Sequence, residues 1–113
     1  NEVYIRSLHQ KLIEGLNMLE GVAINSPLEA IPHIVNLSIM AMPSKESQKF
    51  LSERGIYVST QTACSSDESR SETVYRLTLS ETKARSSIRI SLSQLTTNDE
   101  IESLLKAIAE VTL

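Results

Sequence analysis

Hydrophobic positions recur at helical spacing near both ends of the chain. Between residues 3 and 20 the apolar side chains fall three or four positions apart, and Gly21 follows as a stop signal. The same spacing predicts a final helix, which begins with a capping box formed by Thr97 and Glu100. One face of this helix carries Ile101, Leu104, Leu105 and Ile108.

Two stretches between these helices, residues 33–40 and 86–93, alternate apolar with polar side chains, which predicts strands with one buried face. The apolar positions are Val35, Leu37 and Ile39 in the first stretch and Ile88, Ile90 and Leu92 in the second. Residues 22–25 and 56–59 are shorter runs of the same kind. We expect these four segments to be the strands of the domain.

The middle of the chain gives weaker signals. Residues 43–55 predict a helix with Ser44 as its N-cap and Gly55 just beyond its end. Residues 60–71 show no apolar periodicity and are expected to be a mobile loop, whereas residues 72–79 fit either a short helix or a strand. The whole stretch 60–85 is therefore expected to be mostly irregular, which in a compact domain indicates a functional or disordered segment.

This order of elements predicts an α+β fold, in which helices cover a small, mostly antiparallel sheet. A length of 113 residues fits a single domain spanning 1–113. The chain opens on Asn1 and leads directly into a helical pattern. We therefore expect it to be the C-terminal fragment of a longer protein.

Composition excludes several classes of function. The chain has 11 basic and 14 acidic residues and a net charge of −3, which argues against a nucleic-acid surface. It has no apolar run long enough for a transmembrane helix, so no membrane association is expected. Cys64 is the single cysteine, which rules out an internal disulfide and fits a cytoplasmic protein.

Cys64 lies in the polar segment 60–71, and its position leaves two readings open. It is either a tolerated exposed cysteine or a functional thiol. A thiol reacts as the thiolate, which needs a nearby cation or base. Arg70 follows it, but Asp67 and Glu68 lie between them, so the sequence predicts no strong activation.

Arg89 is the second unusual residue, because it interrupts an apolar strand at a phase that turns it away from Ile88 and Ile90. It is either a solvated arginine on the outer face or a rigidly held guanidinium that binds a carboxylate. A fixed anchor combined with a mobile thiol would suit an amino-acid substrate. His9 and His33 have no partner at metal-ligand spacing, so no metal site is expected. The five lysines, at positions 11, 45, 49, 83 and 106, lie in no cofactor-attachment motif.

Three segments together resemble a known family. "IPHIVNLSI", "LSERGIYVSTQTACSS" and "SSIRISLSQLTTNDEIESLLKAI" are similar to the C-terminal part of NifS/IscS-type cysteine desulfurases, which are pyridoxal-phosphate enzymes of the class V aminotransferase superfamily. The resemblance implies that Cys64 is catalytic, that Arg89 binds the substrate carboxylate and that Asn36 lies near the substrate pocket. The interval from Cys64 to Arg89 resembles the long-loop, IscS-like group, in which the cysteine is carried on a flexible segment.

The resemblance also implies a reaction. L-cysteine joins the cofactor, the Cys64 thiolate takes its sulfur as a persulfide, alanine is released, and the sulfur passes to an acceptor or Fe–S scaffold protein. The family's cofactor lysine belongs to a large domain that is not in these residues, so this chain alone is expected neither to bind pyridoxal phosphate nor to be active. The full-length enzyme is expected to be a homodimer. A selenocysteine lyase, another class V aminotransferase domain or a stand-alone thiol or redox module remains an alternative.

The sequence departs from the family in two places. Gln61-Thr62 stands where the family usually has Gly-Ser before Ala-Cys, and Ser93-Gln94 stands where it usually has Gly-Arg after the arginine strand. Both departures leave Cys64 and Arg89 in place. We expect them to affect rate or acceptor choice rather than the reaction itself.

Overall fold

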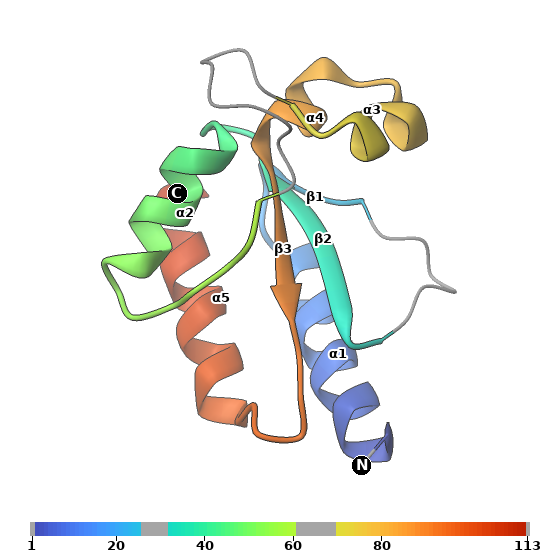
Figure 1. The fold of residues 1–113 in the computed structure, drawn as a ribbon. Coiled ribbons are helices and arrows are strands. Elements are labelled where there is room, and N and C mark those ends of the chain that lie inside the picture. Colours follow the sequence, from blue (N-terminus) through green and yellow to red (C-terminus); the bar gives the residue numbers. More distant parts are fainter. Residues whose placement is uncertain (1, 26–31, 61–69, 113) are drawn as a thin grey trace.

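A three-stranded antiparallel sheet, in the order β1-β2-β3, is the centre of the fold (Figure 1). The computed structural model describes residues 2–25, 32–60 and 70–112. Its elements are α1 (Glu2–Asn17), β1 (Val22–Ile24), β2 (Ile34–Ile39), α2 (Ser44–Ser52), α3 (Glu72–Thr78), α4 (Glu81–Ser86), β3 (Ser87–Ser91) and α5 (Asn98–Thr112). The expected α+β class, a small antiparallel sheet covered by helices, is confirmed.

One face of the sheet is apolar, and α1 and α5 cover it (Figure 1). Alternation along β2 and β3 puts every second side chain on this face. The residues that close the core are fully or almost fully buried: Leu8, Leu12 and Leu16 from α1, Val35, Leu37 and Ile39 from β2, Ile88 and Ile90 from β3, and Ile101, Leu104 and Ile108 from α5. The predicted apolar faces of both strands and both terminal helices are thus confirmed.

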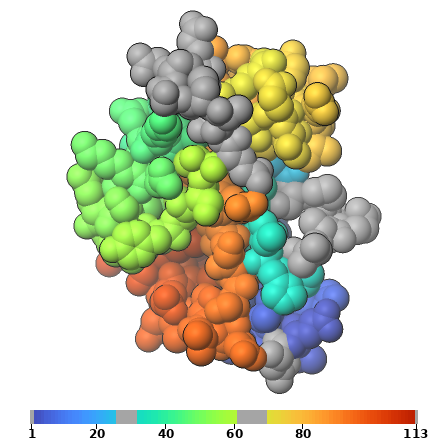
Figure 2. Space-filling model, viewed as in Figure 1, coloured from blue at the N-terminus to red at the C-terminus, as the bar shows by residue number. Residues whose placement is uncertain are grey.

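The other face of the sheet is polar, and α4 covers only one end of it. At that end Ala23, Ser38 and Ser87 lie directly opposite one another across the three strands. We call these three residues the small row. Their short side chains allow α4 to approach, and the Ser38 hydroxyl donates a hydrogen bond to the Lys83 carbonyl (2.7 Å). In the view of Figure 2, β2 and β3 reach the surface beside α2 and below the α3–α4 pair.

Two short helices occupy the stretch that was expected to be mostly irregular. The Ser71 hydroxyl accepts a hydrogen bond from Val74 N and begins α3, and the Ser80 hydroxyl accepts one from Lys83 N and begins α4. Such serine caps satisfy backbone donors that a helix start leaves unpaired. Of the two alternatives for residues 72–79, the short helix is confirmed, whereas the irregular structure expected up to residue 85 was wrong where α4 forms. The expectation weighed the lack of apolar periodicity above two good N-cap residues.

The start of α2 also differs from expectation. Pro43 is its N-cap, and Ser44 is the first helical residue. The Ser44 hydroxyl donates instead to the Arg85 carbonyl (2.8 Å), which ties α2 to α4. A serine that looks like a local cap thus makes a contact between two distant segments.

Residues 56–59 do not form the expected strand. Only Ser59 pairs with β3, in an isolated bridge to Arg89, and Tyr57 two positions earlier is 83% exposed. At the start of this segment, Ile56 N still donates a hydrogen bond to the carbonyl of Leu51 in α2 (2.9 Å). The segment pairs with β3 only at Ser59, so it forms a single bridge and no continuous strand.

The two ends of the chain follow the predictions more closely. The expected capping box is confirmed, since Thr97 N donates to Glu100 Oε1 (2.9 Å) and Glu100 N donates to Thr97 Oγ1 (3.1 Å). The first helix ends at Asn17, three residues before its predicted end, in turns that tighten toward Gly21. Gly21 adopts a left-handed φ of 78°, as expected of a residue that stops a helix.

Leu79 adopts a left-handed conformation that glycine usually occupies, with φ 55° and ψ 27°, while its side chain is 78% exposed. We predict that Leu79→Gly increases the free energy of unfolding by about 1 kcal/mol, because it relieves backbone strain and removes little buried surface. Leu77→Gly is the matched control: this leucine is also largely exposed (58%) but lies inside α3. The control should lower stability by about 1 kcal/mol. Urea denaturation of both variants would test this, and equal effects would contradict it.

Ser38 and Ser87 are buried, cross-strand neighbours with different bonding. The Ser38 hydroxyl donates to Lys83 and accepts from Asn25 Nδ2 (2.9 Å), whereas the Ser87 hydroxyl has no partner among the described residues. We predict that Ser38→Ala lowers the free energy of unfolding by about 1–3 kcal/mol and that Ser87→Ala leaves it unchanged or raises it slightly. Denaturation curves for the two variants would show whether the bonding, rather than the burial, decides the sign.

Candidate functional site

Arg89 lies on the polar face of the sheet, in the middle of β3, as its phase in the strand predicted. Its backbone is held from the side away from β2, because Arg89 N donates to the Ser59 carbonyl (2.8 Å) and Ser59 N donates to the Arg89 carbonyl (3.0 Å). A residue that exchanges both bonds with one neighbour forms a close, non-hydrogen-bonded pair with its other neighbour. That other neighbour is Asn36 on β2.

The side chains of Asn36 and Arg89 therefore lie next to each other on the polar face. Asn25, one residue beyond β1, completes the line across the sheet: its backbone N–H donates to the Asn36 carbonyl (2.8 Å), and its Nδ2 donates to Asn36 Oδ1 (2.9 Å). We call Asn25, Asn36 and Arg89 the polar row. It runs parallel to the small row, displaced along the strands away from the end that α4 covers.

The guanidinium of Arg89 has no acidic partner within the described residues. Its Nε–H is buried and makes no hydrogen bond to any of them. By contrast, four of the other five arginines, Arg6, Arg54, Arg70 and Arg85, are each paired with a glutamate, and the fifth, Arg76, is exposed on α3. A desolvated guanidinium N–H without an acceptor is unfavourable for folding. Such a group on a rigid strand is a candidate ligand-binding residue, and the chemistry it fits best is a carboxylate or another anion.

Sequence reasoning missed Asn25, which is almost completely buried. It lies at the end of a short strand candidate, before the dipeptide Ser26-Pro27, and no local pattern marks it. Its importance comes from the β1–β2 register, which aligns it with Asn36. The signal that could have found Asn25 is the polar face of residues 33–40, because a strand that pairs with them is expected to place polar side chains on the same face.

Cys64 and the unusual pair Gln61-Thr62 lie outside the described residues, but both ends of the segment that carries them are described. The preceding end is fastened at Ser59, which pairs with the backbone of Arg89. Cys64 follows Ser59 by five positions, and an extended stretch of that length spans at most about 17 Å. Chain geometry alone therefore limits the distance of Cys64 from the Arg89 backbone.

Arg70 fastens the following end of the segment. Its guanidinium is paired with Glu72 (2.9 Å) and with Glu81. The guanidinium also stacks on Tyr75, 3.9 Å from the ring centroid. Hydrogen bonds to Glu72 and Glu81 raise the pKa of Arg70. Bonds from Arg85 and Arg70 lower the pKa of Glu81. Arg70 thus anchors the segment to α3 and α4 and has its charge compensated there.

The second departure from the family pattern, Ser93-Gln94, lies in the turn between β3 and α5. Leu95 N donates to Ser93 Oγ (3.1 Å), and Ser93 N donates to Thr96 Oγ1 (3.0 Å). A serine side chain can stabilise such a turn by bonding to the backbone two residues on. The turn therefore forms with serine at this position, beyond the end of the strand that carries Arg89.

A cavity of about 410 Å³ lies elsewhere, between residues 54–58 and the first turns of α5. Its lining does not include the polar row. Within the described part of the chain, no group of histidine, cysteine and acidic side chains could hold a metal ion. None of the described helices is both long enough and apolar enough to cross a membrane.

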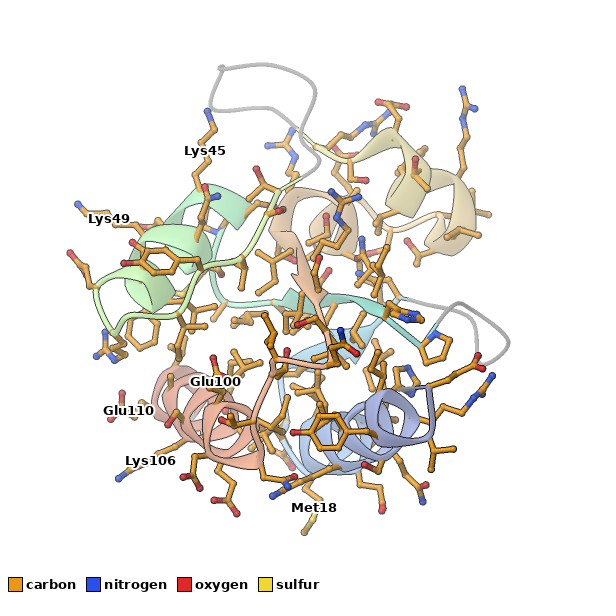
Figure 3. All side chains as sticks on the ribbon, turned by 60° about the horizontal axis from the view of Figure 1, so that its bottom comes forward. Met18, Lys45, Lys49, Glu100, Lys106 and Glu110 are labelled. Atoms are coloured by element: carbon orange, nitrogen blue, oxygen red, sulfur yellow. The ribbon has the colours of Figure 1, made fainter. Side chains whose placement is uncertain are left out.

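Pyridoxal phosphate is attached to its enzymes through a lysine amine, and none of the five lysines lines the cavity described above. Lys45 and Lys49 on α2 and Lys106 on α5 point away from the body of the chain (Figure 3). Lys11 is paired with Glu102 (3.2 Å) at the surface. We therefore derive no step through this cofactor.

The chain is similar to several known proteins. Curated relatives include proteins named "Cysteine desulfurase IscS" from Buchnera aphidicola (33% identical over 107 residues, 93% of this chain) and Vibrio vulnificus strain YJ016 (35% over 104 residues, 90% of this chain). The chain spans about a quarter of their length, 26% and 25% respectively.

Two solved structures of NifS-like proteins are also similar to this chain. A NifS-like protein matches 95% of this chain and 27% of its own, with a TM-score of 0.78 and 31% identity. A NifS-like protein from Rickettsia africae matches 98% of this chain and 29% of its own, with a TM-score of 0.81 and 27% identity. The profile of the family described as Aminotransferase class-V matches residues 2–104. The chain belongs to the class-V aminotransferase family.

Proposed function

We propose that this chain is part of a cysteine desulfurase and supplies the groups that bind and attack the substrate. The observation that carries the proposal is the part-buried guanidinium of Arg89, which has no acidic partner among the described residues and is held on a strand between Ser59 and Asn36. The similarity to proteins named cysteine desulfurase supports the choice of reaction. The Ser59–Arg89 bridge supports it further, because the segment that carries Cys64 begins beside the proposed anchor.

In this proposal Arg89 binds the carboxylate of L-cysteine, and Asn36 lies beside it. Binding fixes the substrate relative to a rigid strand, so that its sulfur is presented to the thiolate of Cys64. A bond forms between the two sulfur atoms, and the carbon–sulfur bond of the substrate breaks. The products are a Cys64 persulfide and, after protonation at carbon, alanine. The electron pair of the broken bond requires an acceptor that these residues do not supply, which is the role of pyridoxal phosphate in the family.

The tethered cysteine then passes its sulfur to an acceptor or Fe–S scaffold protein. Both ends of its segment are fastened, at Ser59 and at Arg70, so the proposal has the thiol move between substrate and acceptor without leaving the domain. The proposal includes a cytoplasmic, homodimeric enzyme whose cofactor site lies outside these residues. The 113 residues alone are then inactive.

The first test is Cys64→Ser in the complete gene product supplied with pyridoxal phosphate. The variant should lose persulfide formation, detected by mass spectrometry of the protein after incubation with L-cysteine. It should keep the visible absorbance of the bound cofactor, because Cys64 takes part in sulfur transfer and not in cofactor binding. Release of sulfide at the wild-type rate would refute the role of Cys64.

The second test concerns the carboxylate anchor. We predict that Arg89→Ala raises KM for L-cysteine by about ten- to a hundredfold, with a smaller effect on kcat, because the anchor acts in ground and transition states alike. Arg89→Lys should lie between the two, since it keeps the charge and loses the fork geometry. Arg76→Ala, which changes an exposed arginine on α3, is the control and should match the wild type. An unchanged KM for Arg89→Ala would show that this residue does not bind the substrate.

A further inference from the structure

Asn25 is bound to the polar row more extensively than its place at a strand end requires. It is 8% exposed, and its backbone N–H donates to the Asn36 carbonyl (2.8 Å). Its side-chain Nδ2 donates to two acceptors, Asn36 Oδ1 (2.9 Å) and Ser38 Oγ (2.9 Å). The Asn25 amide therefore contacts both the polar row and the small row.

The direction of these hydrogen bonds follows from one group that can only accept. The Lys83 carbonyl accepts the single hydrogen of the Ser38 hydroxyl (2.7 Å). Ser38 Oγ must then accept from Asn25, so the NH₂ group of Asn25 faces it. The same NH₂ group meets Asn36, which requires the oxygen of Asn36 to face Asn25. The polarity of the whole chain of bonds is set by a backbone carbonyl in α4.

The direction of these hydrogen bonds also decides which end of the Asn36 amide faces away from Asn25. Asn36 lies between Asn25 and Arg89 in the polar row, so the end of its amide opposite the oxygen, the NH₂ group, is turned toward the side of Arg89. Arg89 carries only donors. A site formed by a guanidinium and an amide NH₂ fits an acceptor-only group such as a carboxylate. With the Asn36 amide reversed, its oxygen would face the carboxylate and repel it.

The carbonyl oxygen of Asn25 shows that this arrangement is unfavourable for stability alone. Asn25 Oδ1 is buried and accepts no hydrogen bond from the described residues. A buried acceptor without a donor destabilises the folded state, and such groups in a folded protein call for an explanation. The Nδ2 bonds of Asn25 provide one, since they orient Asn36.

We propose that Asn25 is a positioning residue for the substrate carboxylate: it acts through Asn36, whose NH₂ group it turns toward the ligand beside Arg89. This inference rests on the proposed function, because it assumes that Arg89 binds the carboxylate of an amino acid. It adds to that function a residue that does not contact the substrate, and it gives the reason why the site accepts a carboxylate.

Asn25→Asp is the most informative variant, because it keeps the shape of the side chain and replaces the donating NH₂ with an oxygen. The new carboxylate cannot donate a hydrogen bond to Asn36, so the Asn36 amide is expected to reverse. In the complete gene product with pyridoxal phosphate, KM for L-cysteine should rise roughly tenfold, the effect of about one hydrogen bond. The value of kcat should change less than KM, because Asn25 does not touch the reacting atoms.

A double-variant comparison separates positioning from a general structural effect. If Asn25 acts through Asn36, then Asn25→Asp should not raise KM further in a protein that already carries Asn36→Ala. Ser87→Ala is the control: it changes a buried polar residue of the small row and should leave KM unchanged. An unchanged KM for Asn25→Asp, or independent and multiplicative effects of the two substitutions, would overturn the proposal.

Ser38→Ala provides the same test if Asn25→Asp does not yield folded protein. It removes the hydroxyl that fixes the direction of the Asn25 amide, so KM should rise, and an unchanged KM would again overturn the proposal. If the proposed desulfurase function itself is wrong, the measurements should give a different result. In that case the wild-type protein releases no alanine from L-cysteine, or Arg89→Ala leaves KM unchanged, whatever the Asn25 variants do.

Discussion

The antiparallel pairing of β2 with β3 is the constraint on which the rest of the structure depends. Its register places Val35 opposite Ile90 and Asn36 opposite Arg89, so that one face is apolar and the other polar. A slip of one residue would turn the apolar set outward, so burial against α1 and α5 fixes the register strongly. The position of Arg89 on the polar face is therefore a consequence of how the core is built.

The polar face divides into two parts with different roles. The small row lets α4 approach closely, and its Ser38 hydroxyl satisfies a carbonyl of that helix. The polar row contains two buried atoms, Asn25 Oδ1 and Arg89 Nε, that have no partner among the described residues. The small row also contains one such atom, Ser87 Oγ, but only the polar row combines unpartnered atoms with a charged guanidinium, which is typical of residues kept for binding. Ser38 of the small row links the two parts, because it bonds both to α4 and to Asn25.

The treatment of charge outside the sheet supports this division. The arginines at positions 6, 54, 70 and 85 are paired with glutamates. Arg70 forms ion pairs with Glu72 of α3 and Glu81 of α4, and these pairs hold one end of the segment that contains Cys64. Ser59 holds the other end at Arg89. The proposed nucleophile thus follows by five residues a position, Ser59, that pairs with the backbone of the proposed anchor, which supports their acting on one small substrate.

The sequence by itself determined the terminal helices, the two long strands with their faces, and the outward phase of Arg89. These depend on periodicity and local capping, which neighbouring residues fix. The sequence left residues 72–79 open between helix and strand, and it did not predict α4, the single pairing of Ser59 or the tie from Ser44 to Arg85. The last two are contacts between segments far apart in the sequence. Only the tertiary structure brought Asn25 beside Asn36 and left the Arg89 guanidinium without an acidic partner in the described part of the chain. Hydrogen-bond satisfaction depends on which strands become neighbours, and no local pattern records that.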